Sequence, residues 1–152
     1  MNGVKAAPWK YVDETGIRVN GKNWWLWIFR TPTDILVVIR PSRSGKVLEE
    51  ILGAKIAGAG ITDSWSAYNA FQVMQRCWTH LPREVDDYKD MPEGEELLKV
   101  IHCKFKKMRK FLDKEPPMED RKQMKKQWDT EMVQLVERFT KYEGLHKPMT
   151  RV

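Results

Sequence analysis

The first forty residues carry apolar and β-branched positions in runs of the length expected for β-strands. Residues 11–19 mix apolar and polar positions, and the Asn20-Gly21 pair that follows is the strongest short-range signal for a two-residue hairpin turn. The next two runs, 24–29 and 35–39, are apolar on both faces, which predicts central strands that are covered on both sides. A turn at 31–34 separates them. The pattern therefore predicts a three-stranded antiparallel meander.

The period of the pattern changes after residue 40. Residues 46–52 place their apolar positions on one face, which predicts a short amphipathic helix. Ser42 or Ser44 is a candidate N-terminal cap for this helix, and Gly53 suits its C-terminal stop. A strand reached through such a crossover helix can lie parallel to the first strand.

Three further segments complete the first half of the chain. The small residues of 57–62 predict a short strand, 64–71 has a helical pattern, and 73–77 predicts a fifth strand. The order is then three strands, helix, strand, helix, strand. This order is typical of the α/β class and predicts a mixed five-stranded sheet with helices.

From Pro82 onward the chain is rich in charged, helix-favouring residues, and two apolar stripes recur at steps of three and four. The stripes are Leu97, Ile101, Phe105, Met108 and Leu112, then Met124, Trp128, Met132, Leu135, Phe139 and Tyr142. Glu115-Pro116-Pro117 must interrupt the helix between them. The pattern predicts an antiparallel helical hairpin whose stripes face each other or the sheet. We expect three parts: a core at 1–90, a helical hairpin at 91–145 and a tail at 146–152.

Composition narrows the classes of protein. The apolar fraction of 41% and the charged fraction of 32% indicate a globular chain, and no apolar run approaches the roughly twenty residues of a membrane span. The N-terminus has no apolar signal core, and Cys77 and Cys103 are too few for a disulfide framework. These features favour the cytoplasm. The net charge of +6 permits nucleic-acid binding without requiring it.

Two aspartates are the candidate ligands of a metal site. Asp63 stands where the strand at 57–62 ends and a helix-like segment begins, at the rim of an open α/β sheet where ligands usually bind. Asp13 lies fifty residues earlier, within the first predicted strand. We expect the two carboxylates to meet and to share a divalent metal. The alternatives are an exposed strand acid for Asp13 and a helix N-cap for Asp63.

Several ordered motifs carry a family resemblance. They are Val12-Asp13-Glu14-Thr15-Gly16, Arg18-Val19-Asn20-Gly21-Lys22, Trp24-Trp25-Leu26-Trp27, Arg40-Pro41-Ser42-Arg43, Asp63-Ser64-Trp65-Ser66-Ala67-Tyr68 and Arg76-Cys77-Trp78-Thr79-His80-Leu81. In this order they resemble the insertion sequence sixty-six family of DDE transposases, enzymes of mobile DNA elements. The similarity spans most of residues 9–90 and continues more weakly through the helical tail.

The resemblance implies a ribonuclease H-like catalytic domain with a helical hairpin insertion. In that family two aspartates and a glutamate hold two Mg²⁺ ions, about 3.5–4 Å apart in such two-metal sites, for DNA strand cleavage and transfer. The first aspartate corresponds to Asp13 and the second to Asp63. The third acid belongs to a later motif, so we expect it beyond Val152 and expect the usual N-terminal DNA-binding region to be absent. The chain then resembles a truncated middle piece of a transposase.

Other acidic and metal-binding residue types carry less weight. Glu119, Glu131, Glu137 and Glu143 are candidates for the third ligand by position only, and an amphipathic helix explains all of them. Alternation along a strand points Glu14 away from Asp13. Cys77 and His80 have a spacing compatible with zinc, yet structural zinc needs four ligands. The resemblance implies a packing or supporting role for that pair.

Basic residues are the candidate contacts to DNA at the transposon ends. Arg40, Arg43 and Lys46 cluster near a predicted helix start and could touch a phosphate. Lys106, Lys107 and Lys110 belong to the densest basic run. The alternatives are an exposed basic turn and a solvated helix face. We expect DNA and no membrane as partner and a location at the nucleoid, and we leave a homo-oligomer open.

Three hypotheses about function follow from the sequence. The first is a transposase catalytic-core fragment with Asp13 and Asp63 as its metal ligands. The second is a non-catalytic remnant that binds DNA or a protein partner through the basic hairpin. The third is a product of a decayed reading frame that has no present function.

Overall fold

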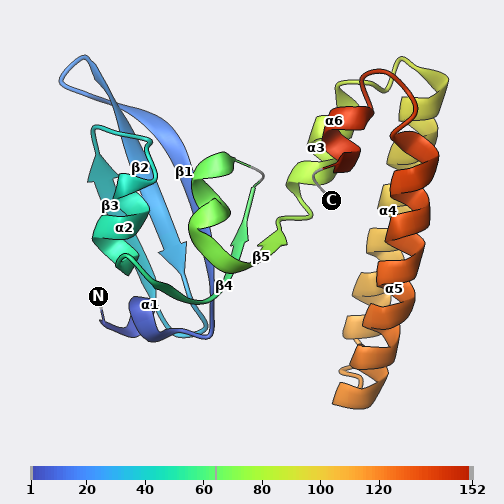
Figure 1. Ribbon diagram of the computed structural model, residues 1–152, viewed down its shortest axis with the longest axis horizontal. Helices are drawn as coiled ribbons and strands as arrows, with labels where there is room; N and C mark the ends of the chain where they lie inside the picture. The colour runs from blue at the N-terminus through green and yellow to red at the C-terminus, as the bar shows by residue number, and fades with distance from the viewer. Residues whose placement is uncertain (1, 64, 151–152) are drawn as a thin grey trace. The chain divides into compact units, whose positions relative to one another are not determined.

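The chain divides into two compact units, Met1–Cys77 and Trp78–Val152, each with its own core (Figure 1). The computed structural model describes residues 2–63 and 65–150. Ser64, the first residue of the helical segment predicted at 64–71, lies outside the described residues, as do the last two residues of the predicted tail.

The first unit alternates strands and short helices. Its elements are α1 (Asn2–Ala6), β1 (Trp9–Val19), β2 (Lys22–Arg30), β3 (Ile35–Arg40), α2 (Lys46–Leu52), β4 (Ile56–Thr62), the 3-10 helix η1 (Ser66–Ala70) and β5 (Phe71–Arg76). Within the described residues the five strands form one mixed sheet in the order β3-β2-β1-β4-β5. The β1–β2 and β2–β3 pairs are antiparallel, whereas β1–β4 and β4–β5 are parallel. The predicted α/β class and mixed sheet are confirmed.

The hairpin between β1 and β2 has the predicted two-residue turn. Asn20 and Gly21 both have positive φ angles, 49° and 76°, and Val19 pairs directly with Lys22. A type I′ turn requires positive φ at both central residues, and its twist matches that of the flanking strands. This local chemistry fixes the register along the whole of β1, including the position of Asp13 opposite Ile28.

One face of the sheet carries the core of this unit. Trp27, Phe29, Leu48 and Tyr68 are fully buried and belong to one cluster with residues from α1, α2 and β1. The predicted amphipathic helix is confirmed as α2, because its four apolar residues are all buried. Gly53 ends the helix at a φ of 95° and donates its backbone N–H to the Glu49 carbonyl at 2.8 Å.

The opposite face of the sheet departs from the prediction. Ile28 is 39% exposed, Val37 51% and Ile35 68%, although these runs were expected to be covered on both sides. An apolar run shows that both faces favour burial, but only tertiary packing decides which face is covered. In this unit the short helices α1 and α2, together with Tyr68, pack on the Trp27 face.

The predicted capping of α2 was wrong. Neither Ser42 nor Ser44 caps α2, whose N-cap is Gly45 with no side-chain hydrogen bond. The Ser42 hydroxyl instead accepts the backbone N–H of Ser44 at 3.0 Å and so shapes the preceding turn. The helical segment predicted after Asp63 is present as the 3-10 helix η1, which is shorter than the predicted range.

The second unit is helical. Its elements are α3 (His80–Asp86), α4 (Pro92–Leu112), α5 (Met118–Phe139) and α6 (His146–Thr150). The predicted hairpin of α4 and α5 is confirmed, with Pro116-Pro117 in the loop and Glu115 at a positive φ of 49°. Residues from both stripes share one core, and α3 and α6 add Leu81 and Met149 to it. No helix in the described part of the chain combines the length and apolar character of a membrane span.

Candidate functional site

The parallel pairing of β1 with β4 governs how the two candidate aspartates lie. The ladder pairs Trp9 with Ala59 and ends with Tyr11 opposite Ile61. Asp13 lies two residues after Tyr11 on β1, and Asp63 lies two residues after Ile61, just past the end of β4. If the register continues, the two residues lie side by side at the carboxyl end of β4, where open α/β sheets bind ligands.

Asp13 and Asp63 have different surroundings. Asp13 is exposed on β1, on the opposite side from buried Val12, and its Oδ1 accepts the backbone N–H of Glu14 at 3.0 Å. Asp63 is half-buried just after β4, and its Oδ1 accepts the backbone N–H of Trp65 at 2.8 Å. Each carboxylate has a second oxygen whose lone pairs suit a hard cation.

Glu14 lies in a buried polar cluster on the other side of β1. Its side chain is 1% exposed and accepts a hydrogen bond from Arg43 Nε at 2.7 Å and another from the Tyr68 hydroxyl. Burial raises the pKa of Glu14, and its hydrogen bonds to Tyr68 and Arg43 oppose that shift. As predicted from strand alternation, Glu14 does not share a side of β1 with Asp13.

Tyr68 interacts with Glu14 through a hydrogen bond and with Asp13 and Asp63 through their charges. Its side chain is fully buried, and burial, the hydrogen bond to Glu14, and the charges of Glu14, Asp63 and Asp13 together raise the pKa of its hydroxyl. The phenol therefore stays protonated and acts as a donor at neutral pH. All three carboxylates lie within electrostatic reach of this one hydroxyl.

Arg43 is held by aromatic rings as well as by Glu14. Its guanidinium lies 5.0 Å from the centre of the Trp25 ring and 4.5 Å from that of Trp65. The sequence indicated that Arg43 contacts DNA, and the Glu14–Arg43–Tyr68 cluster was not predicted. The available signal was a glutamate beside the apolar Val12 in a predicted strand, because a buried carboxylate needs a partner.

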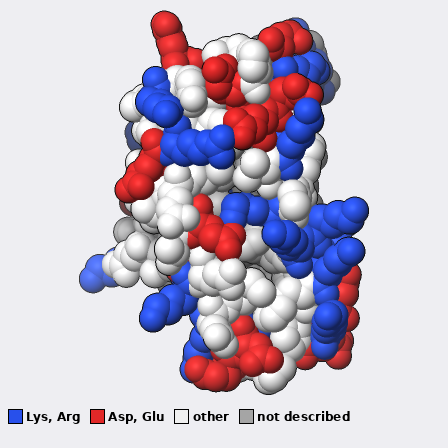
Figure 2. Space-filling model, turned by 90° about the vertical axis from the view of Figure 1, so that its right-hand side faces the viewer, with Lys and Arg blue, Asp and Glu red and all other residues white. Residues whose placement is uncertain are grey.

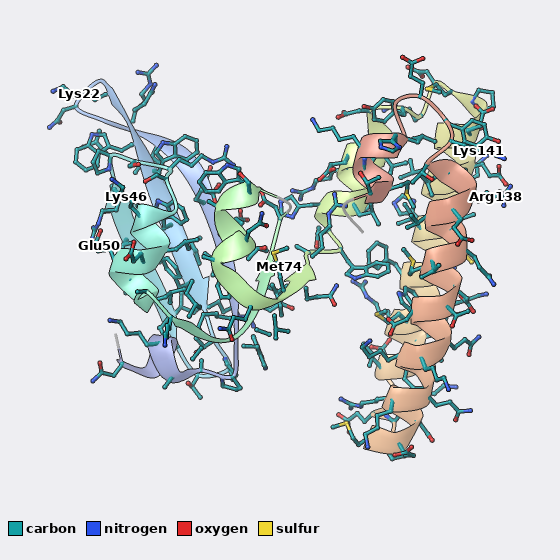
Figure 3. The ribbon with its side chains drawn as sticks, viewed as in Figure 1. Lys22, Lys46, Glu50, Met74, Arg138 and Lys141 are labelled. Carbon is teal, nitrogen blue, oxygen red and sulfur yellow. The ribbon has the colours of Figure 1, made fainter. Side chains whose placement is uncertain are left out.

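The other predicted basic residues lie at the surface of their units. Arg40 forms an ion pair with Glu50 of α2, and Lys46 is the exposed first residue of the same helix; Figure 3 labels both Lys46 and Glu50 on α2. Lys106, Lys107 and Lys110 are exposed on α4 and form no ion pair with another described residue.

The basic part of α4 borders an open groove of the helical unit. The groove has a volume of about 780 Å³, and Lys106 and Lys110 line it beside Phe105, Met108 and Leu112. Figure 2 shows basic side chains gathered at mid-height on the right of the face in view, with acidic ones above and below. The predicted DNA-contacting lysines therefore border a surface that is part apolar and part cationic.

A three-ligand metal site is absent from the described residues. They contain no group of three or more histidine, cysteine, aspartate or glutamate side chains arranged to hold a metal ion. Glu131 pairs with Lys104, and Cys77 is half-buried and free. The donor set nevertheless fits Mg²⁺ in kind, since this ion prefers carboxylate oxygens and keeps several waters.

Comparison with known families assigns the chain to a protein family. The family model described as "Transposase IS66 family" matches residues 1–150. The chain therefore belongs to the IS66 family of transposases, the family that its motifs resemble. Comparison with curated proteins and with solved structures found no match.

Proposed function

We propose that the sheet unit is the ribonuclease H-like catalytic core of a DDE transposase, which cleaves and transfers DNA strands with Mg²⁺ held by Asp13 and Asp63. The parallel β1–β4 register, which ends two residues before both aspartates, is the observation that supports this assignment most directly. Family membership supplies the substrate class, because transposases act on DNA.

The residues of the chain have distinct roles in this proposal. Asp13, exposed on β1, supplies a carboxylate that a DNA phosphate can approach, and Asp63 supplies the second from the end of β4. When bound, Mg²⁺ activates the attacking oxygen and stabilises the leaving oxygen of the phosphodiester. The DDE mechanism also requires a third acidic ligand, which we assign to no described residue.

A metal titration tests the pair. We expect Asp13→Asn and Asp63→Asn each to weaken Mn²⁺ binding, measured by isothermal titration calorimetry, by about tenfold or more, because each removes one of two charged ligands. Asp90→Asn, an exposed aspartate of the helical unit, makes the same charge change and should leave the affinity unchanged. Equal affinities in wild type and both site variants would count against a shared metal site.

The basic hairpin supports a second candidate, a DNA-binding module that works without catalysis. Lys106, Lys107 and Lys110 place three exposed positive charges on one helix, and each phosphate contact steepens the salt dependence of DNA binding. The two candidates are compatible within one transposase. They differ in whether DNA binding is accompanied by metal binding at Asp13 and Asp63.

Changing these three lysines to glutamate should weaken duplex binding. We expect the slope of log affinity against log salt to become less steep by about 2.7, which corresponds to three lost phosphate contacts. Fluorescence anisotropy at several salt concentrations measures it. Lys122→Glu and Lys125→Glu, at lysines that pair with acids within α5, form the control. An unchanged slope in the triple variant would remove the hairpin from the DNA interface.

A further inference from the structure

A partly buried hydrogen bond links the segment that follows Asp63 to β1. After Asp63 the chain enters η1, and the Tyr68 side chain at its centre donates a hydrogen bond to Glu14. Glu14 is the immediate neighbour of Asp13 on β1. This hydrogen bond therefore joins the strand that bears the first aspartate to the segment that follows the second.

Aromatic packing gives this bond one geometry. The Tyr68 ring makes edge contacts with Trp65, at a centroid distance of 5.6 Å, and with Trp27 at 6.5 Å. Tyr68 and Trp27 are both fully buried, so water does not compete for the hydroxyl. Arg43 Nε donates to Oε1 of Glu14, the oxygen that Tyr68 does not use.

The segment itself is stiffened at both of its ends. The Asp63 carboxylate accepts the Trp65 backbone N–H at 2.8 Å, and the Tyr68 backbone N–H donates to the Trp65 carbonyl at 3.0 Å. Trp65 also packs 6.1 Å from Trp27 of β2. A displacement of Tyr68 would thus reach Asp63 through Trp65, over only a few hydrogen bonds.

We propose that Tyr68 and Glu14 are a positioning pair that holds the Asp63 carboxylate beside Asp13 for metal binding, an inference that rests on the proposed function. Neither residue contacts the metal in this arrangement. Glu14 is buried on the opposite side of β1 from Asp13, and both of its oxygens already accept hydrogen bonds. The pair supports a metal ligand from outside the metal's own contacts, and loss of such a support typically lowers metal affinity by about ten- to a hundredfold.

Tyr68→Phe removes the hydroxyl and keeps the ring. We expect Mn²⁺ affinity to fall by roughly ten- to a hundredfold, as for other outer supports of metal ligands. In metal-free protein we expect the Trp65 amide, which Asp63 accepts, to exchange with solvent faster by about tenfold, since the segment opens more readily. Tyr11→Phe, at an exposed tyrosine of β1, is the matched control and should change neither quantity.

Two further variants separate positioning from ligation and from loss of stability. Glu14→Gln keeps an oxygen that accepts the Tyr68 hydroxyl, so Mn²⁺ affinity should stay within about threefold of wild type. Phe29→Leu lowers the stability of the same core without touching the pair, and it should leave metal affinity unchanged. If Glu14→Gln weakens Mn²⁺ binding as strongly as Asp13→Asn does, Glu14 is a ligand and the proposal is overturned.

Failure of this inference is distinguishable from failure of the proposed function. If Asp13→Asn and Asp63→Asn weaken Mn²⁺ binding but Tyr68→Phe does not, the metal site stands and the positioning pair is overturned. If the aspartate variants bind as wild type does, the proposed function fails, and the positioning role for metal binding falls with it. If the Trp65 amide exchanges with solvent at the same rate in Tyr68→Phe as in wild type, the positioning role of Tyr68 and Glu14 is overturned in either case.

Discussion

Replacing Trp27 with alanine is expected to destabilise the sheet unit by about 3–5 kcal/mol, the range for large-to-small changes of aromatic residues in a core. Trp27 is fully buried at the centre of β2 and stacks near Phe29, with ring centroids 6.3 Å apart. Its indole N–H also donates to the Ser42 carbonyl at 3.2 Å. The change therefore leaves a cavity and an unpaired carbonyl in the same place.

The effect is measured by hydrogen exchange of the β2 amides at increasing urea, which reports the sheet unit separately from the helical unit. Ile28→Ala is the matched control, because Ile28 neighbours Trp27 on the same strand and is 39% exposed. We expect it to reduce the free energy of unfolding by about 1 kcal/mol, in proportion to the smaller area that it buries. Similar losses in both variants would contradict the one-sided core.

Arg43→Met is expected to make the stability of the sheet unit strongly dependent on pH. Burial already raises the pKa of Glu14 above its ordinary value of 4.5, and the hydrogen bond and charge of Arg43 oppose that rise. Without Arg43 the pKa rises further. A carboxyl whose folded-state pKa is raised stabilises the protein below the unfolded value, and that stability is lost as pH rises through the folded value.

The stability of the variant should thus approach that of wild type below pH 4.5 and should be lower than that of wild type at higher pH. Near neutrality we expect a loss of about 2–3 kcal/mol, below that of a fully buried pair because the Arg43 side chain is 42% exposed. Thermal unfolding from pH 4 to pH 8 measures the difference. Arg40→Met breaks the exposed Arg40–Glu50 pair and should change the stability little at any pH, because exposed ion pairs contribute little. A flat pH profile for Arg43→Met would show that Glu14 is not held by Arg43.

The parts of the fold that the sequence predicted are those specified locally. Asn20-Gly21 dictates its own turn, and the four apolar residues of α2 recur with a helical period, so both were confirmed. The family was recognised because its motifs keep their order along the chain. The helices α3 and α6 were not predicted, since each buries only two residues, too few to display a helical period.

The rest of the site depends on contacts between distant residues. Glu14, Arg43 and Tyr68 are separated by at least twenty-five positions, and nothing near any one of them specifies the other two. The exposed face of β2 and β3 was missed for the same reason, because an apolar run does not say what covers it. The shared metal at Asp13 and Asp63 remains a prediction from the sequence.

The parallel pairing of β1 with β4 has a consequence for the order of folding. The β1–β2 hairpin closes over two residues, whereas β4 can join β1 only after the chain has crossed the sheet through α2. Contacts of such long sequence separation form late, because the loop entropy must be lost first. A nascent chain therefore holds one aspartate on an early hairpin and gains a partner for it only when the sheet is nearly complete. Under this assignment, DNA-cutting capacity would mature as one of the last steps of folding.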